Sequence, residues 1–456
     1  MRGPNSSGGR AGRFTLALVL SIFIMLILSS VQIAARDGTD EVGGERQVFK
    51  WGFSERVRQA YIMNGFDLDN DSADDRNYVR VRTKLWCSYE PTDDLMLYAG
   101  LNNEHRHYFK PDVDFEIGEV IFENLYIKAK NIGGSPVTVI AGRQNMMHGE
   151  GFIFMDGGPL DGSRTGYFNA LRVILEKGER SLEFHVLSNP ERDEYLPRMN
   201  SRRQRLIEWD ETGAGVYYTE RSLRSADIEA YYLFKREEDD GNAFPKTDLH
   251  TIGARIEASP LERLVLTAEG AYQTGERGDN DRTGYGGYLY GTYRAPMGLA
   301  PELTAGVIYL SGDDRKTGEF EGWDPLYSRW PKWSELYIYT LVSEYGLPSY
   351  WSNLFAPHVG LGLKPCKRLT LLANAYFMRA AQAQECYETE DATVCPLPPI
   401  GTGEDRGLLT TLWIKWSFTK YLTGHLLWER FKPGDFYSED NRETAHFLRW
   451  EFLFKY

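Results

Sequence analysis

Apolar and polar side chains alternate along many short segments of this chain. In Tyr78–Tyr89, valine, threonine and leucine alternate with arginine and lysine, and in Leu448–Tyr456 aromatic residues alternate with Arg449, Glu451 and Lys455. Successive side chains of a β-strand point to opposite faces, so each segment has one apolar and one charged face. We find no helical stripe longer than two turns, and the pattern predicts an all-β protein.

Candidate strands follow one another from residue 48 to the carboxyl end without a domain break. They lie near Phe49, Tyr78, Leu95, Val120, Val137, Tyr167, Ser181, Thr212, Asp227, His250, Leu264, Tyr285, Leu303, Pro357, Leu369, Gly407, Thr423 and Thr444. An even set of about eighteen strands is in the range in which a closed barrel encloses an aqueous channel.

A soluble β-sandwich shares this periodicity, so the barrel rests on other features. The last strand ends on an aromatic residue, Tyr456, after rings at alternate positions. Turn chemistry recurs at Glu90–Asp94, Gly133–Pro136, Lys177–Arg180 and Ser259–Arg263, and long polar stretches such as Pro190–Asp210 and Arg236–Thr247 lie between. These features predict a transmembrane antiparallel β-barrel in the bacterial outer membrane, with short periplasmic turns and long extracellular loops.

The amino terminus has the order of a secretory signal. Arg10 and Arg13 precede the apolar run Phe14–Leu28, and small residues follow up to Ala35. The run is short for a helix that spans a bilayer, which disfavours the alternative of a retained anchor. We expect a signal peptide over 1–35, a flexible leader over 36–47 and one barrel domain over 48–456.

Composition and charge narrow the possible partners. Aromatic residues make up 14% of the chain, which suits pleated surfaces and membrane interfaces. A formal net charge of −13 makes nucleic acid a poor partner. After export, Cys386 and Cys395 could close a small loop, but the pairing of the four cysteines stays open.

The alternation also predicts which charged side chains face the water-filled lumen, because a register slip would put them into hydrocarbon. The residues expected along the solute path are Arg56, Arg58, Arg80, Arg82, Lys84, Glu104, Arg106, Lys128, Arg143, Arg172 and Arg255. Further inward residues are Glu183, Glu229, Glu257, Glu269, Glu429, Arg449 and Glu451. Two interpretations remain: a locally basic lining that steers an anion, or charges that pair across strands and fill the lumen.

Two groups of motifs carry a family resemblance. The first is Ala141–Gly151, with its Gly142-Arg143-Gln144 strand, followed by Asp161–Arg172. The second is Ser311-Gly312-Asp313, then Gly322–Trp330 with an aromatic-Asp-Pro-Leu loop, and Tyr350–Leu354. Together they resemble the alginate export family of outer-membrane proteins, over about residues 48–456.

The resemblance implies an eighteen-stranded barrel with a narrow charged conduit for polyanionic alginate. It also implies that Arg143 faces the lumen and that Asp324 and Pro325 belong to a folded-in loop. Two features depart from the family. Phe168-Asn169 stands where the family has Phe-Asp, and the family's arginine cluster has no residue-by-residue match here.

Catalytic and metal chemistry finds little support in the motifs. His105 and His107 share one strand face, but no third metal ligand is evident. Asp67–Asp75 lacks the glycine and closing glutamate of a calcium loop. No Gly-x-Ser-x-Gly elbow or phosphate cradle occurs. We therefore expect no catalytic residues, metal or cofactor.

The densest aromatic group includes Trp323, Trp330 and Trp333, which with Asp324 are candidates for a constriction loop. They fit either a sugar-stacking platform or, better, loop packing and an interfacial girdle. The expected function is passive passage of an anionic saccharide or other small anion, in contact with outer-membrane lipid and possible periplasmic export partners. The alternatives are a barrel hydrolase acting on lipid or cell-wall material, and a secreted sugar-binding β-protein.

Overall fold

The computed structural model describes residues 48–111, 116–155, 168–197, 207–239, 245–388, 393–394, 396 and 398–456. The expected signal peptide and leader lie outside these residues, as does the Asp161–Tyr167 part of the first motif. Among the helices of the described residues, none is long and apolar enough to cross a bilayer.

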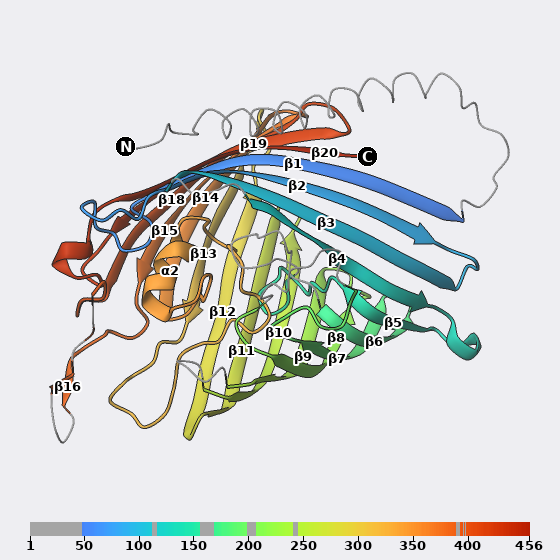
Figure 1. The fold of residues 1–456 in the computed structure, drawn as a ribbon, viewed down its shortest axis with the longest axis horizontal. Helices are drawn as coiled ribbons and strands as arrows, with labels where there is room; N and C mark the ends of the chain where they lie inside the picture. The colour runs from blue at the N-terminus through green and yellow to red at the C-terminus, as the bar shows by residue number, and fades with distance from the viewer. Residues whose placement is uncertain are drawn as a thin grey trace, which may run out of the picture.

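Eighteen antiparallel strands form one closed sheet, because β1 pairs with β2 on one side and with β20 on the other. The strands are β1 (Phe49–Met63), β2 (Arg76–Tyr89), β3 (Leu95–Lys110), β4 (Glu116–Ala129), β5 (Val137–Gln144), β6 (Phe168–Lys177), β7 (Arg180–Asn189), β8 (Glu211–Glu220), β9 (Ala226–Glu237), β10 (Thr247–Leu261), β11 (Leu264–Arg277), β12 (Asn280–Arg294), β13 (Glu302–Leu310), β14 (Leu354–Cys366), β15 (Leu369–Arg379), β18 (Asp405–Ser417), β19 (Leu422–Pro433) and β20 (Ala445–Lys455). Figure 1 shows them as one ring, with β20 beside β1. The barrel and its strand number are confirmed.

Neighbouring residues of one strand differ sharply in exposure, as two-faced strands require. In β10, Thr251 is fully buried whereas the next residue, Ile252, is 61% exposed. The paired residues of β11 repeat this, with Gln273 buried opposite Thr251 and Tyr272 48% exposed opposite Ile252. A belt of exposed apolar residues on the outer face therefore meets lipid, and the polar set faces inward.

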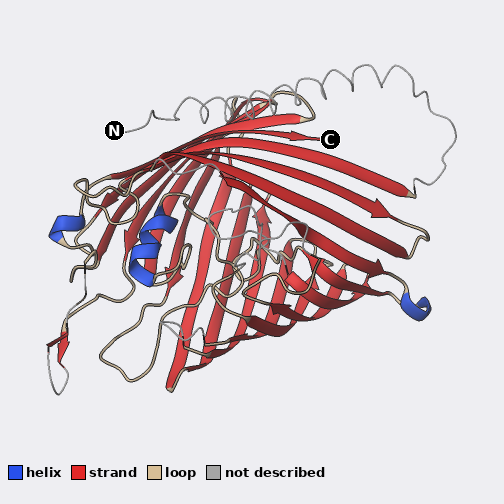
Figure 2. Cartoon of the chain, in the orientation of Figure 1, coloured by secondary structure: helices blue, strands red, loops and turns tan. Residues whose placement is uncertain are grey.

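The connections alternate in length around the barrel (Figure 2). Gly178 and Glu179 join β6 to β7, and Glu262 and Arg263 join β10 to β11. The latter turn is shorter than expected, because β10 continues through a register shift to Leu261. At the opposite ends of the strands lie longer loops, of which residues 311–353 are the longest described stretch. Smaller elements are η1 (Ile132–Gly134), α2 (Tyr337–Tyr345), the β16 (Tyr387–Glu388) and β17 (Thr393–Val394) hairpin, and η3 (Glu439–Asn441).

One element contradicts the expectation that no helical stripe exceeds two turns. Helix α2 has nine residues, about 2.5 turns, and its aromatic and β-branched residues favour strands locally. Tertiary contacts stabilise its start, where Ser334 Oγ accepts hydrogen bonds from the Leu336 and Tyr337 amides. Glu429 of β19 accepts a further bond from the Leu336 amide, and the helix ends at Gly346 with φ of 70°.

The exposed belt predicts a depth-dependent cost for a charge on the outer face. Leu289 lies near the middle of β12 and is 52% exposed, whereas Leu299 lies in the turn after β12 and is 55% exposed. We expect Leu289→Arg to lower the free energy of unfolding from lipid bilayers by about 2–4 kcal/mol, and Leu299→Arg by about 0–1 kcal/mol. Equal costs in reversible urea titrations would contradict this placement of the membrane.

Candidate functional site

The lumen is crossed by residues 311–353, the lumen loop, which carries α2. On one side Asp324 reaches β9, β11 and β12, and on the other side Tyr339 Oη lies 3.3 Å from Tyr78 Oη of β2. Ser334 Oγ also donates a hydrogen bond of 2.5 Å to Glu429 of β19. In Figure 1, α2 lies within the outline of the barrel. The loop therefore spans the channel between opposite walls and narrows it.

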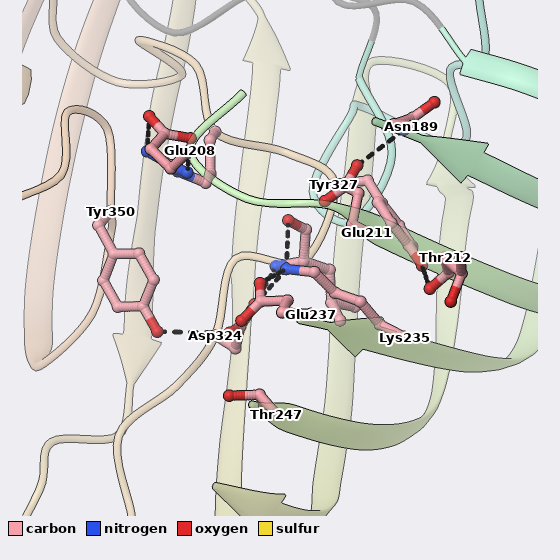
Figure 3. Close-up of polar contacts among 12 residues, drawn as sticks. Asn189, Glu208, Glu211, Thr212, Lys235, Glu237, Thr247, Asp324, Tyr327 and Tyr350 are labelled. Atoms are coloured by element: carbon pink, nitrogen blue, oxygen red, sulfur yellow. Dashed lines mark hydrogen bonds and ion pairs between the residues drawn. The ribbon is translucent and has the colours of Figure 1, made fainter. Parts of the chain in front are cut away.

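Asp324 is the best-connected residue of the lumen loop and is 1% exposed. Its carboxylate pairs with Lys235 Nζ at 3.3 Å, and Tyr350 Oη donates to it at 3.3 Å (Figure 3). Arg282 Nη2 lies 3.0 Å from the same carboxylate. Its backbone N–H and C=O bond to the Gln273 amide side chain at 2.9 Å each. Burial alone would raise the pKa of Asp324, but the charges of Lys235 and Arg282 lower it to about 2. Asp324 therefore stays ionised and holds the loop on three strands.

A second segment, residues 145–155 after β5, packs against the lumen loop. The Phe152 ring stacks on Trp323 at 5.1 Å, and Phe154 stacks on Tyr327 at 4.6 Å. Trp330 Nε1 donates to the Gly151 carbonyl at 3.3 Å. The two segments thus form one aromatic core inside the barrel.

This packing decides between the two interpretations of the tryptophans. Trp323 is 1% exposed, and Trp333 packs edge-on against Trp351 at 5.0 Å. Trp330 accepts a hydrogen bond of 2.9 Å at its carbonyl from Trp351 Nε1. Loop packing therefore accounts for these residues, and a sugar ring has no access to the face of Trp323.

The far end of α2 is held by a buried ion pair. Arg406 Nη1 of β18 lies 2.8 Å from Glu344 Oε1, and both side chains are 1% exposed. Tyr337 and Tyr437 Oη atoms lie 2.6 and 3.3 Å from the same nitrogen. Sequence reasoning missed this group, since its members lie far apart in the chain.

Five arginines gather on the inner faces of β1, β2 and β3. The register places Arg58, Arg80 and Arg106 in one row and Arg56 and Arg82 in the next. Two carboxylates lie among them: Glu104 Oε1 is 2.9 Å from Arg80 Nε and 3.0 Å from Arg106 Nε, and Glu451 Oε2 is 2.9 Å from Arg58 Nη2. Among the described side chains, this basic wall therefore holds five arginines and two carboxylates, and the backbone register places Glu116 of β4 opposite Arg106.

Other predicted lumen cations pair mainly across strands. Arg172 makes two bonds of 2.8 and 2.6 Å to Glu183 of β7, and Arg255 Nη1 lies 3.7 Å from Glu229 of β9. Arg255 Nη2 also lies 2.6 Å from Glu257 of its own strand. Lys84 pairs with Glu123 of β4, and Lys128 lies between Met96 and Ile140 in the register. Pairing therefore describes Lys84, Arg172 and Arg255, whereas the described side chains of the basic wall include more arginines than carboxylates.

Arg143 differs from the other predicted lumen residues. Gly142, with φ of 125°, interrupts the alternation of β5. Arg143 pairs with Leu125 and with Asn169, and Asn169 lies on the same face of β6 as Leu171, which points outward. Its guanidinium is buried and makes two bonds of 3.0 and 2.8 Å to Asp193, in the loop after β7. Arg143 thus anchors a long loop, and its register does not place it in the lumen lining that the resemblance implied.

Opposite the basic wall, tyrosines and glutamates line β8, β9, β11 and β12. Tyr217 Oη donates to Glu229 at 2.5 Å, and Tyr231 and Tyr288 donate to Glu269 at 3.1 and 2.8 Å. The period-two placement of tyrosines was the available signal, but sequence reasoning selected charged residues only. The lumen therefore has a basic wall and a tyrosine–glutamate wall.

A pocket of about 260 Å³ opens at the loop ends of the strands, above the Asp324 contacts. Arg277, Arg282 and Arg315 line it together with Tyr345 and Tyr350. The Arg277 guanidinium lies 4.3 Å from the Phe320 ring centre. This pocket places three guanidinium groups on the route between the outer loops and the lumen loop.

The remaining motifs serve local structure. His105 and His107 pair in the register with Val81 and Val79, which places both histidines on the outward face of β3. In the Asp67–Asp75 loop, Asp67 and Asp69 accept hydrogen bonds from nearby backbone amides. Cys386 is disulfide-bonded, whereas Cys87 and Cys366 are free thiols; Cys395 lies outside the described residues. These contacts give the Asp67–Asp75 loop a structural role.

A sequence model described as alginate export matches residues 51–450. No curated protein matches the chain. Among solved structures, OccK7 (OpdD) of Pseudomonas aeruginosa is 12% identical, with a TM-score of 0.52 over 90% of this chain and 99% of that one.

Two further structures have the same fold. A BenF-like porin from Pseudomonas fluorescens Pf-5 is 11% identical, with a TM-score of 0.55 over 91% of this chain and all of that one. OccK2 (OpdF) of Pseudomonas aeruginosa, in complex with glucuronate, is 11% identical with a TM-score of 0.53 over 91% and 100% of the two chains. At these identities the likeness shows the fold.

Proposed function

The chain belongs to the alginate export family, and from this premise we propose that it conducts an acidic saccharide of the uronate class across the bacterial outer membrane. It is an outer-membrane channel and not an enzyme, which sets aside the barrel hydrolase and the secreted sugar-binding protein. The observation that carries the proposed solute class is the basic wall, where five arginines gather on the inner faces of three neighbouring strands.

The chemistry of the basic wall suits a sugar acid. Guanidinium groups bind carboxylates through paired hydrogen bonds, so Arg56, Arg82 and Arg106 would attract the uronate charge. On the opposite wall the hydroxyls of Tyr217 and Tyr288 are buried and already donate to Glu229 and Glu269, so the attraction for the solute comes from the basic wall. Several weak contacts in place of one strong site let a solute both enter and leave. The glucuronate bound to OccK2 is of the same chemical class and supports this choice.

Solute selectivity provides the test of this proposal. With single channels in planar bilayers, we expect a short oligouronate to reduce the KCl current in a concentration-dependent way, because its carboxylates compete with chloride at the basic wall. A neutral oligosaccharide of the same length is the control and should reduce the current much less. Equal effects of the two sugars would contradict the proposed solute class.

Two expectations about the rest of the chain join this proposal. The order of positive charges, apolar run and small residues supports cleavage of a signal peptide after Ala35. The mass of the protein purified from outer membranes would test this cleavage site. Periplasmic export partners would meet the face that carries the short turns, where the last strand also ends at Lys455.

A further inference from the structure

Two histidines and a glutamate meet between the wall of the barrel and the segment 145–155. Glu183 and His185 lie on the inner face of β7, and His148 comes from the segment after β5. Their exposed fractions are 6%, 3% and 8%. The Glu183 Oε1 atom is 3.4 Å from His185 Nδ1 and 3.5 Å from His148 Nε2.

These imidazoles are buried without hydrogen-bond partners. His148 Nε2 and both ring nitrogens of His185 make no hydrogen bond, and the separations from Glu183 are too long for good ones. A polar group that is buried without a partner destabilises the folded protein, because it has lost its hydrogen bonds to water. Two of these nitrogens, His148 Nε2 and His185 Nδ1, converge on the Glu183 Oε1 atom, and a further group between the three would satisfy them.

We propose that His148, Glu183 and His185 form a binding site for a divalent transition-metal ion of the zinc class. One ligand atom from each residue lies within 4.8 Å of the others. Tetrahedral zinc with bonds of about 2.0–2.2 Å places its ligand atoms about 3.3–3.6 Å apart, close to the two measured separations. Two imidazoles and one carboxylate are the ligand types of open zinc sites, whereas calcium prefers six to eight oxygen atoms.

The surroundings orient these ligands. The His148 ring stacks on Tyr217 with centres 4.0 Å apart, and Phe154 packs edge-on against both imidazoles at 5.4 and 5.2 Å. Arg172 bonds to both oxygens of Glu183, as carboxylate ligands of metals are commonly bonded by outer residues. The positive charge of Arg172 also repels a metal ion and competes with it for the Glu183 carboxylate, which lowers the metal affinity of the site.

A bound ion would connect two parts of the channel. His148 belongs to the segment whose Phe152 and Phe154 pack on the lumen loop, and the other two ligands belong to the wall. The ion would therefore tie the aromatic core to β7. This inference does not depend on the solute and holds for any molecule that the channel conducts.

Metal titration of the full-length mature barrel in detergent tests the site. We expect the wild type to bind one Zn²⁺ in competition with a chromophoric chelator, and His148→Phe, which keeps the ring stacking, to weaken binding at least tenfold. His185→Ala should act similarly. The matched control is His105→Ala with His107→Ala, which removes an outward-facing pair and should leave binding unchanged.

A spectroscopic measurement on the unaltered protein guards against misfolded variants. With Cu²⁺ as probe, the electron paramagnetic resonance spectrum should show coupling to two imidazole nitrogens. Absence of stoichiometric binding, or full binding by the His148→Phe, His185→Ala double variant, would overturn the site. The three residues would then form a histidine–carboxylate ion pair without a metal.

Discussion

Asp324→Ala should release the lumen loop and enlarge the open channel. The substitution removes the carboxylate that Lys235 and Arg282 share. Lys235 keeps Glu237 at 2.5 Å, but the buried Arg282 loses the carboxylate 3.0 Å from its Nη2, and breaking a buried pair in this way costs about 3–5 kcal/mol. Such a cost shifts the docking equilibrium of the loop about a hundredfold or more. We expect a several-fold rise in single-channel conductance and rapid proteolysis within residues 311–353, while the strands stay paired.

Asp314→Ala is the matched control for this experiment. Asp314 lies on the same loop but is only half-buried, and its carboxylate accepts a bond only from the nearby Lys316 amide among the contacts described. Its removal should leave conductance and protease resistance unchanged. If Asp324→Ala also behaves like the wild type, the anchoring role of Asp324 is wrong. The low pKa further predicts that acidification to pH 4 does not release the loop through Asp324.

Neutralising two arginines of the basic wall should shift ion selectivity toward cations. Arg82 and Arg106 are less buried than Arg56, Arg58 and Arg80, so glutamine at both positions is expected to be tolerated. The double substitution removes two of the five positive charges of the basic wall. We expect a several-fold decrease in the anion-to-cation permeability ratio, measured as the reversal potential in a KCl gradient, because the local potential sets the concentration of anions.

An equal change in charge outside the lumen provides the comparison. Arg224 and Arg263 are exposed in the short turns after β8 and β10, and Arg224→Gln with Arg263→Gln removes the same two charges. This variant should have a reversal potential close to that of the wild type. Similar shifts in both double variants would show that overall charge, and not the basic wall, controls selectivity.

The strands were predictable because lipid and water impose opposite demands on alternate residues. Ile252 and Tyr272 can only face outward if Thr251 and Gln273 face inward, and this local rule acts in every strand. The same rule identified the arginines of β1 and β2. It failed at Arg143, because a single glycine with positive φ, Gly142, interrupts the alternation.

The contents of the lumen were less predictable because they depend on contacts between distant segments. Strand periodicity does not reveal that Glu104 and Glu451 lie among the arginines, since those partners follow from register and from closure of the barrel. Helix α2 forms against the local preference of its residues, with Ser334 and Glu429 at its start. The motif around Asp324 pointed to the right loop, but not to the residues that hold it.

The contacts of α2 also set an order of assembly. Tyr339 touches Tyr78 of β2, and Leu336 bonds to Glu429 of β19, two strands that come near each other only through the β1–β20 seam. Until the first and last strands meet, the helix has only half of its docking surface. The lumen loop should therefore dock last, after the strands have inserted into the membrane. Resistance of the loop to protease would then show that β1 and β20 have paired.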